Sequence, residues 1–412
     1  MSGMTANGLG LVLTIALARL LDERAYGAYA SLLGLSLILS MPGSALVVAV
    51  VRKVYDLRAA CLGADVGPWS RQVRRRLTVV AAVSPLCGAV VAAPVSRLLS
   101  IPSVLGVALI VAACGVWALL GFERGLLQAD GSYPSLGRNL LVEAAVRTVV
   151  TVGLVGAGAG VGGAAGGVIA AHLTAASHAR RSVARGAAAE VVEGPPVVGA
   201  AGSPELGRDA AAALVVLALL AVLQTLDVLV VGREAPGRSG SYAAISVTSK
   251  GLLFIGFALT QYLLPEAARR FSSGQGALRQ LGVSLALLAV PAGGLLVISL
   301  AVPELLLRTV FGPELVGAAA ALPTLVLAMA ALSAAVLLSY YLLAARRREV
   351  VVLLAVAVLT VLVALRWADG RPVATARALL ACNAALAGIL CAVAVRASRR
   401  ADRRADVTAP GG

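Results

Sequence analysis

Five ionisable residues stand inside long apolar runs of this sequence: Arg19, Glu143, Arg147, Asp227 and Lys250. A charge in an apolar medium is costly, so such residues are by default candidates for binding or relaying ions. The three cations could hold an anionic group. The two carboxylates could take up a proton or a coupling cation, or balance the cations.

The spacing of these residues leaves two interpretations open for each pair. Glu143 and Arg147 are four residues apart, which puts them on one face of a helix with about 6 Å between them. They either neutralise each other and stabilise helix packing, or Arg147 binds an anion while Glu143 orients it. Asp227 and Lys250 lie in successive apolar runs at depths that differ by about 7 Å, a gap that a lysine side chain can cross. Asp227 is then either the structural partner of Lys250 or a site for a coupling cation or a proton.

Other polar residues in the apolar runs are candidates for lining a cavity: Gln224, Gln261 and Asn383. His172 and His178 are expected to serve in helix packing or at an interface. The five cysteines show no paired spacing, so we expect neither a disulfide framework nor a metal site. No Gly-rich phosphate-binding loop and no pair of carboxylates at catalytic spacing is present, so neither an enzyme nor a cofactor is expected.

The composition predicts which elements carry these residues. Hydrophobic residues make up 59% of the chain and charged residues 13%, and the mean hydropathy is +0.92. Repeated apolar runs of about 20 residues fit membrane-spanning helices. We therefore predict an all-α polytopic membrane protein with about twelve transmembrane helices. The expected spans are residues 3–21, 27–51, 77–95, 104–122, 139–157, 159–177, 210–232, 241–264, 280–302, 318–344, 350–366 and 374–395.

The basic residues predict the orientation of these spans. The chain has 35 Lys and Arg residues and a net charge of +15, and most of these cations fall in alternate loops. The positive-inside rule then places both termini in the cytoplasm of a multi-pass protein of the cell membrane. Because the charge follows the loops, it does not indicate a nucleic-acid partner.

The chain divides into two halves of six spans. Residues 1–178 and 210–396 are the expected lobes, around a central cavity. Residues 179–209, rich in Ala, Gly and Pro, are the expected cytoplasmic linker, and residues 397–412 a basic tail. Each half opens its second span alike, with RAYGAYASLL in the first and RSGSYAAISV in the second. This similarity favours two lobes related as parallel repeats. The tyrosines of both segments suit the aromatic belt at a membrane interface.

Four segments of the sequence carry a resemblance to a known family: ARLLDERAYGAYASL, GFERGLLQADGSYPSLGRNLLVEAAVRTVV, TLDVLVVGREAPGRSGSYAAISVTSKGLLFIGFALTQYLLPEAARR and FGPELVGAAAALPTLVLA. Together they resemble polysaccharide and O-antigen-type flippases of the multidrug/oligosaccharidyl-lipid/polysaccharide (MOP) exporter superfamily. The resemblance spans nearly the whole chain. Asp22 stands where the family usually has glycine.

The resemblance implies a cargo, a polyprenyl-pyrophosphate-linked glycan, which the protein would flip across the membrane for cell-surface polysaccharide assembly. Arg19, Arg147 and Lys250 would then bind the anionic pyrophosphate, with Glu143 and Asp227 coupling an ion or balancing charge. The implied partners are this lipid-linked glycan, membrane lipids and other polysaccharide-assembly proteins.

Charges at the outer ends of the spans predict a gate. Asp22 and Glu23 follow the first span, and Arg233 and Arg238 follow the seventh. Exposed ion pairs are weak enough to break in each transport cycle, so pairing of these acids with these arginines could close an outer gate.

Other functions remain open. An ion-coupled multidrug exporter of the same superfamily would favour acids in the first lobe, and the first four predicted spans contain none. A membrane-embedded polysaccharide-assembly enzyme would need larger outer loops than this sequence has. A scaffold without transport would not need embedded charges.

Overall fold

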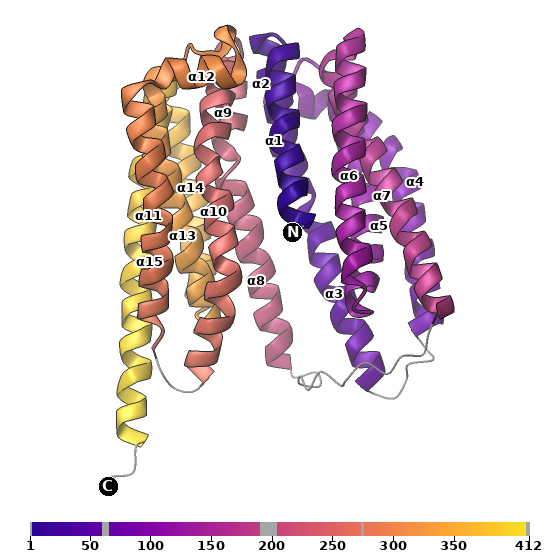
Figure 1. Cartoon of the computed structure of the whole chain (residues 1–412), viewed down its shortest axis with the longest axis vertical. Helices are drawn as coiled ribbons and strands as arrows, with labels where there is room; N and C mark the ends of the chain where they lie inside the picture. The colour runs from indigo at the N-terminus through magenta and orange to yellow at the C-terminus, as the bar shows by residue number, and fades with distance from the viewer. Residues whose placement is uncertain (1, 60–65, 190–203, 273–275, 409–412) are drawn as a thin grey trace. The chain divides into compact units, whose positions relative to one another are not determined.

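A computed structural model describes residues 2–59, 66–189, 204–272 and 276–408 of the 412-residue chain (Figure 1). Helices make up nearly all of this described part, and no strand occurs in it. The chain forms two compact units, Met1–Gly207 and Arg208–Gly412. Each unit is described separately below.

The first unit is built around α5. This helix packs against α3, α4 and α7, and α6 packs against both α7 and α1. Glycines allow α5 to approach its neighbours closely, because a Cβ built on Gly121 would lie 2.6 Å from the Gly43 carbonyl oxygen of α3. Small residues at such contacts are typical of membrane helices. The helices of this unit are α1 (Ser2–Leu20), α2 (Glu23–Leu39), α3 (Met41–Ala59), α4 (Val66–Leu99), α5 (Val104–Ala129), α6 (Tyr133–Leu154) and α7 (Gly160–Ala189).

The second unit is built around α13, which packs against α10, α11 and α15 and is buried along most of its length. The short helix α12 runs across one end of its neighbours (Figure 1). The helices are α8 (Pro204–Leu223), which contains the boundary between the units, α9 (Leu226–Glu234), α10 (Ser239–Ser272), α11 (Leu278–Ala301), α12 (Pro303–Phe311), α13 (Leu322–Ala344), α14 (Glu349–Trp367) and α15 (Pro372–Thr408).

The prediction of an all-α polytopic membrane protein is confirmed. The described part has ten helical segments long and apolar enough to span a membrane, and a shorter apolar helix, Gly8–Leu20. One of the ten, Tyr133–Arg185, contains both α6 and α7. A π-helical turn, Val155–Ala159, joins these two helices, and they pack on each other, so this segment makes two passes. Ten of the twelve predicted spans each fall mainly on one helix, and the spans 27–51 and 210–232 are each divided between two helices.

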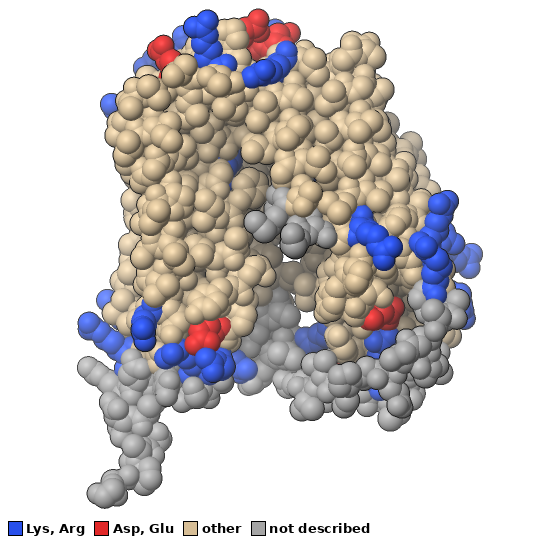
Figure 2. All heavy atoms as spheres, in the orientation of Figure 1, with Lys and Arg blue, Asp and Glu red and all other residues tan. Residues whose placement is uncertain are grey.

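The outer faces of the helices suit lipid. Large apolar side chains stand exposed on α4, α11 and α14, among them Val90 at 69%, Val290 at 75% and Val352 at 63% exposure. On the face of the second unit seen in Figure 2, charged side chains gather near the two ends of the helices, and the residues between them are almost all uncharged. Such a band is what a bilayer requires.

Some helix bounds differ from those predicted. The predicted span 27–51 is interrupted at Ser40, between α2 and α3, and the span 210–232 is interrupted at Gln224 and Thr225, between α8 and α9. Helix covers the start and the end of the predicted linker, since α7 runs to Ala189 and α8 begins at Pro204, and the centre of that linker lies outside the described residues. The predicted tail begins as part of α15.

Candidate functional site

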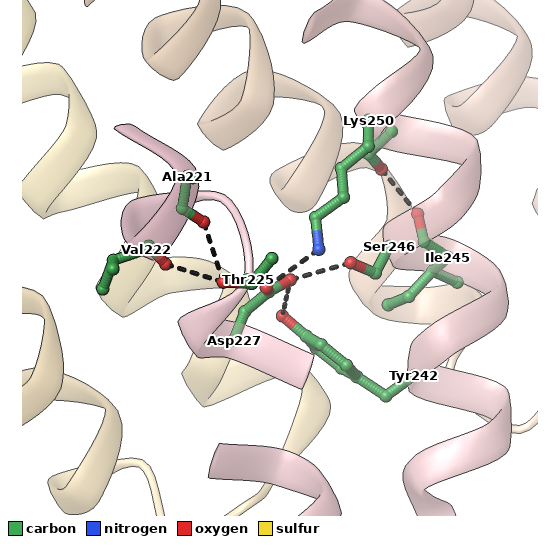
Figure 3. Close-up of polar contacts among 9 residues, drawn as sticks. Ala221, Val222, Thr225, Asp227, Tyr242, Ile245, Ser246 and Lys250 are labelled. Atoms are coloured by element: carbon green, nitrogen blue, oxygen red, sulfur yellow. Dashed lines mark hydrogen bonds and ion pairs between the residues drawn. The ribbon is translucent and has the colours of Figure 1, made fainter. Parts of the chain in front are cut away.

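Asp227 is the centre of a polar cluster in the second unit (Figure 3). Its side chain is 0% exposed, and Lys250 Nζ lies 2.9 Å from its Oδ1. Ser246 donates from Oγ to Oδ2 at 2.8 Å, and the Tyr242 hydroxyl donates to the same oxygen at 3.3 Å. A buried carboxylate is stable only with such partners.

Local helix geometry builds this cluster. Tyr242, Ser246 and Lys250 are spaced by four residues, so they form one stripe along α10 that faces α9. Asp227 lies in the first turn of α9, directly after the break in the seventh predicted span, where the positive end of the helix dipole favours a carboxylate. At the break the Thr225 hydroxyl donates to the Ala221 carbonyl at 2.8 Å. The sequence-based expectation that Lys250 can reach Asp227 agrees with this geometry.

A second polar cluster lies in the first unit and joins α5, α6 and α7. Arg124 Nη2 of α5 lies 2.5 Å from Glu143 Oε2 of α6, and His172 Nε2 of α7 lies 3.5 Å from Oε1. Arg124 also donates from Nε to Asn139 Oδ1 at 2.8 Å. Trp117 completes the cluster: its ring lies beside His172, with centroids 5.1 Å apart, and the Arg124 guanidinium carbon is 5.5 Å from the Trp117 ring centroid.

Arg147 does not pair with Glu143, contrary to the spacing argument. Glu143 points toward α5 and α7, which supply its partners, whereas Arg147 lies near α1 and α2. A Cβ built on Gly10 of α1 would be 3.5 Å from Arg147 Nη2, and the Tyr29 phenol of α2 is within electrostatic range of the guanidinium. Arg147 Nε is buried and has no hydrogen-bond partner within the described part of the chain.

Hydropathy wrongly assigned two charged residues of the first unit to a loop. Glu123 and Arg124 lie inside α5, and Glu123 is 0% exposed and bound by Arg74 of α4, whose Nε is 2.5 Å from Oε1. The expectation that the first four spans contain no embedded acid is therefore wrong. The signal for it was present in the sequence, because Gly121 and Gly125 flank these charges at the four-residue spacing of packed membrane helices.

The tyrosines of the two matching segments are not in an interface belt. Tyr29 and Tyr242 are 4% and 0% exposed, so both lie inside their units. Tyr29 is close to Arg147, and Tyr242 bonds to Asp227. In each unit the tyrosine of the motif therefore lies beside an ionisable residue of a membrane-spanning helix.

The residues of the predicted gate have local roles. Asp22 is the N-cap of α2, where its Oδ1 accepts from the Ala25 amide at 2.8 Å, and Glu23 is the first residue of that helix. Arg233 Nε lies 3.7 Å from Glu234. Arg238 is exposed at the end of a 3-10 turn. The predicted gate pairing joins the two units and stays a prediction.

The remaining predicted residues differ in burial. Arg19 is exposed in the last turn of α1, Gln261 is exposed on α10, and Gln224 is half-buried at the break between α8 and α9. Asn383 is buried and donates from Nδ2 to the Ala328 carbonyl at 3.1 Å, so it joins α15 to α13. Among the residues that the structure describes, no group of three or more His, Cys, Asp and Glu side chains could hold a metal ion.

Comparison with known proteins shows a shared fold. No protein-family model and no curated protein matches the sequence. An inward-facing multidrug resistance MATE family transporter of the MOP superfamily is 12% identical, over 98% of this chain and 96% of its own, with a TM-score of 0.69. The lipid II flippase MurJ, in an inward closed conformation, is 9% identical over 100% of this chain and 93% of its own, with a TM-score of 0.68. A MOP superfamily transporter from Pyrococcus furiosus is 12% identical over 97% and 94%, with a TM-score of 0.61. The chain thus has the polytopic helical fold of MOP superfamily transporters.

Proposed function

We propose that this protein translocates a polyprenyl-pyrophosphate-linked glycan across the cytoplasmic membrane by alternating access, for cell-surface polysaccharide assembly. The observation that carries the proposal is Arg147, a cation in a membrane-spanning helix whose Nε is buried without a hydrogen-bond partner in the described part of the chain. A buried donor of this kind is costly unless a ligand satisfies it. A pyrophosphate oxygen is a suitable acceptor, because guanidinium groups bind phosphate through charge-assisted hydrogen bonds.

The charge balance supports an anionic cargo. Each of the three largely buried acids in the described spans has its own cation: Glu123 has Arg74, Glu143 has Arg124, and Asp227 has Lys250. Arg147 is left in excess of these pairs. A site with a surplus positive charge favours a phosphate-bearing lipid and disfavours a cationic drug.

Lys250 is the second proposed contact for the pyrophosphate. Its side chain is 18% exposed, while its partner Asp227 is 0% exposed. Part of the Lys250 side chain can therefore be reached from outside the cluster, and the flexible four-carbon stem allows the ammonium group to change partners. Arg19, exposed near the end of α1, is a third proposed contact.

Transport in this proposal needs no covalent step. The fold is shared with transporters and a flippase. In the proposal the cargo crosses the membrane chemically unchanged. Both termini are proposed to be cytoplasmic, from the distribution of basic residues.

Export of a cationic drug by ion exchange is the second candidate. One observation favours it: the first unit contains buried acids, Glu123 and Glu143, that could exchange a proton or a cation. Both acids are bound by arginine, however, so a cation would have to displace a guanidinium group to bind there.

Reconstitution with two cargoes separates these candidates. The protein is placed in liposomes that contain a fluorescent polyprenyl-pyrophosphate-linked oligosaccharide, and a membrane-impermeant reductant then bleaches the label in the outer leaflet. Parallel liposomes are tested for ethidium uptake driven by a proton or sodium gradient. We expect bleaching to extend beyond the outer leaflet and no driven ethidium uptake. Driven ethidium uptake without movement of the glycan lipid would overturn the proposal.

A further inference from the structure

We propose that the Asp227–Lys250 pair couples cargo binding to proton uptake: when the Lys250 ammonium moves to a phosphate oxygen of the cargo, Asp227 takes up one proton from water. This inference rests on the proposed function, because it requires an anionic cargo. The proton is then the coupling ion: it is taken up when the cargo binds and given back when the cargo leaves.

The two partners of the ion pair differ in exposure. Asp227 is 0% exposed and lies in the first turn of α9, whereas the Lys250 side chain is 18% exposed and reaches it from the next helix. The carboxylate is fully buried and the lysine side chain is partly exposed, so an anion that arrives from outside meets the lysine first. Lys250 has one anionic partner among the residues described, Asp227.

After Lys250 leaves, Asp227 keeps only neutral hydrogen-bond donors. Ser246 and Tyr242 still donate to Oδ2, but both are neutral, so the buried carboxylate has lost its counter-ion. An ionised carboxylate without a counter-ion is strongly disfavoured in such a place, and a carboxyl group then binds a proton instead.

The cluster can hold Asp227 either as a carboxylate or as a protonated carboxyl group. A hydroxyl group donates one hydrogen bond and accepts others. Ser246 and Tyr242 therefore donate to the carboxylate while Lys250 is present, and either can accept from the carboxyl O–H after Lys250 has left. The exchange needs no movement of α9 or α10.

The balance of charge is simple. Before cargo binds, the pair is neutral, with one ammonium group and one carboxylate. Afterwards the ammonium group, which keeps its three protons, faces the phosphate, and Asp227 carries the proton taken from water. Release of the cargo returns Lys250 to Asp227 and returns the proton to water.

Other charges lie away from the pair. On α9 itself Arg233 pairs with Glu234, and α14 brings Arg366 to that same glutamate at 3.9 Å, at the opposite end of α9. From α10 the titratable groups that face Asp227 are Tyr242 and Lys250. Within the described ranges, no charged side chain of α14 or α15 bonds to Asp227.

The affinity for geranylgeranyl pyrophosphate, measured by titration calorimetry on the full chain in detergent across neutral and alkaline pH, tests the coupling. Because binding takes up one proton, we expect the wild-type Kd to rise by about tenfold per pH unit relative to that of D227N. The ligand's own ionisation affects both proteins equally, so only the difference between their slopes counts. Titrations in two buffers of different ionisation enthalpy should give about one more proton taken up by the wild type than by D227N.

Lys250→Met provides a second variant should D227N fail to fold. Without its counter-ion, Asp227 is already protonated before cargo arrives, so this variant should bind more weakly and also lack the extra proton. Equal pH slopes for the wild type and the variants would overturn the coupling and leave the proposed function standing. No binding of the pyrophosphate by the wild type at any pH would remove the proposed function, and the coupling with it.

Discussion

Arg124 of α5 binds Glu143 of α6, with Nη2 and Oε2 2.5 Å apart and side chains that are 7% and 12% exposed. This ion pair joins two membrane helices and is supported by His172 and Asn139. Because it occupies the carboxylate, Arg147 one turn further along α6 is left without that partner. Whether Arg147 has a partner on its own helix therefore depends on the Arg124–Glu143 pair.

Breaking this pair should destabilise the first unit. Glu143→Gln leaves the Arg124 guanidinium buried without its counter-ion, and we expect a loss of about 3 kcal/mol in the free energy of unfolding. Arg124→Met combined with Glu143→Gln removes both charges and should cost less than the sum of the two single changes. The wild type, the two single variants and the double variant are unfolded in detergent. The loss of helical circular dichroism then gives the free energy of unfolding of each protein. Additive effects would show that the two side chains do not stabilise each other.

The contact between α6 and α7 should not tolerate a methyl group at Gly167. A Cβ built there would lie 1.9 Å from Thr151 Oγ1 and 2.8 Å from the Thr151 backbone nitrogen, so the helices would have to separate. We expect Gly167→Ala to cost about 1–3 kcal/mol. Gly162→Ala on the same helix is the matched control, because its Cβ would make an ordinary contact of 3.5 Å with Leu105. Equal melting temperatures for the two variants would contradict the close approach.

Apolar run length was sufficient to predict the membrane helices, because a helix needs about 20 apolar residues to cross a bilayer whatever it packs against. Asp227 and Lys250 could be placed together because their predicted depths differ by only about 7 Å, a gap that a lysine side chain can cross. Both inferences use geometry within a helix or along the membrane normal. Neither inference requires knowing how the helices are rotated about their own axes.

The wrong predictions concern residues whose environment is set by a neighbouring helix. Spacing allowed Glu143 to pair with Arg147, but the partner that binds it, Arg124, comes from α5 and is 19 residues away in the sequence. Glu123 was assigned to a loop because charge normally ends a span, whereas Arg74 from α4 neutralises it within the helix. Tyr29 was assigned to the interface because tyrosine is amphipathic, yet it packs inside the first unit.

The orientation of the second unit can be tested by cysteine labelling in a background without the native cysteines. Gly237 and Trp367 are exposed at one end of the unit, where Glu234 and Arg366 meet, and Arg279 and Glu349 are exposed near the more basic end. The positive-inside rule predicts that an impermeant maleimide labels cysteines at 237 and 367 in intact cells. Cysteines at 279 and 349 should react only after the cells are opened. The reverse pattern would overturn the cytoplasmic placement of the termini.

The most direct test of the central claim is the rate at which Arg147 variants flip the labelled polyprenyl-pyrophosphate-linked oligosaccharide in liposomes. Arg138→Ala is the matched control, since Arg138 is exposed on the same helix. Loss of a charged hydrogen bond worth about 1.5–3 kcal/mol predicts that Arg147→Ala slows flipping by about 10- to 100-fold. Arg147→Lys, which keeps the charge, should fall between alanine and the wild type, and Arg138→Ala should match the wild type. Wild-type flipping by a folded Arg147→Ala protein would contradict the account.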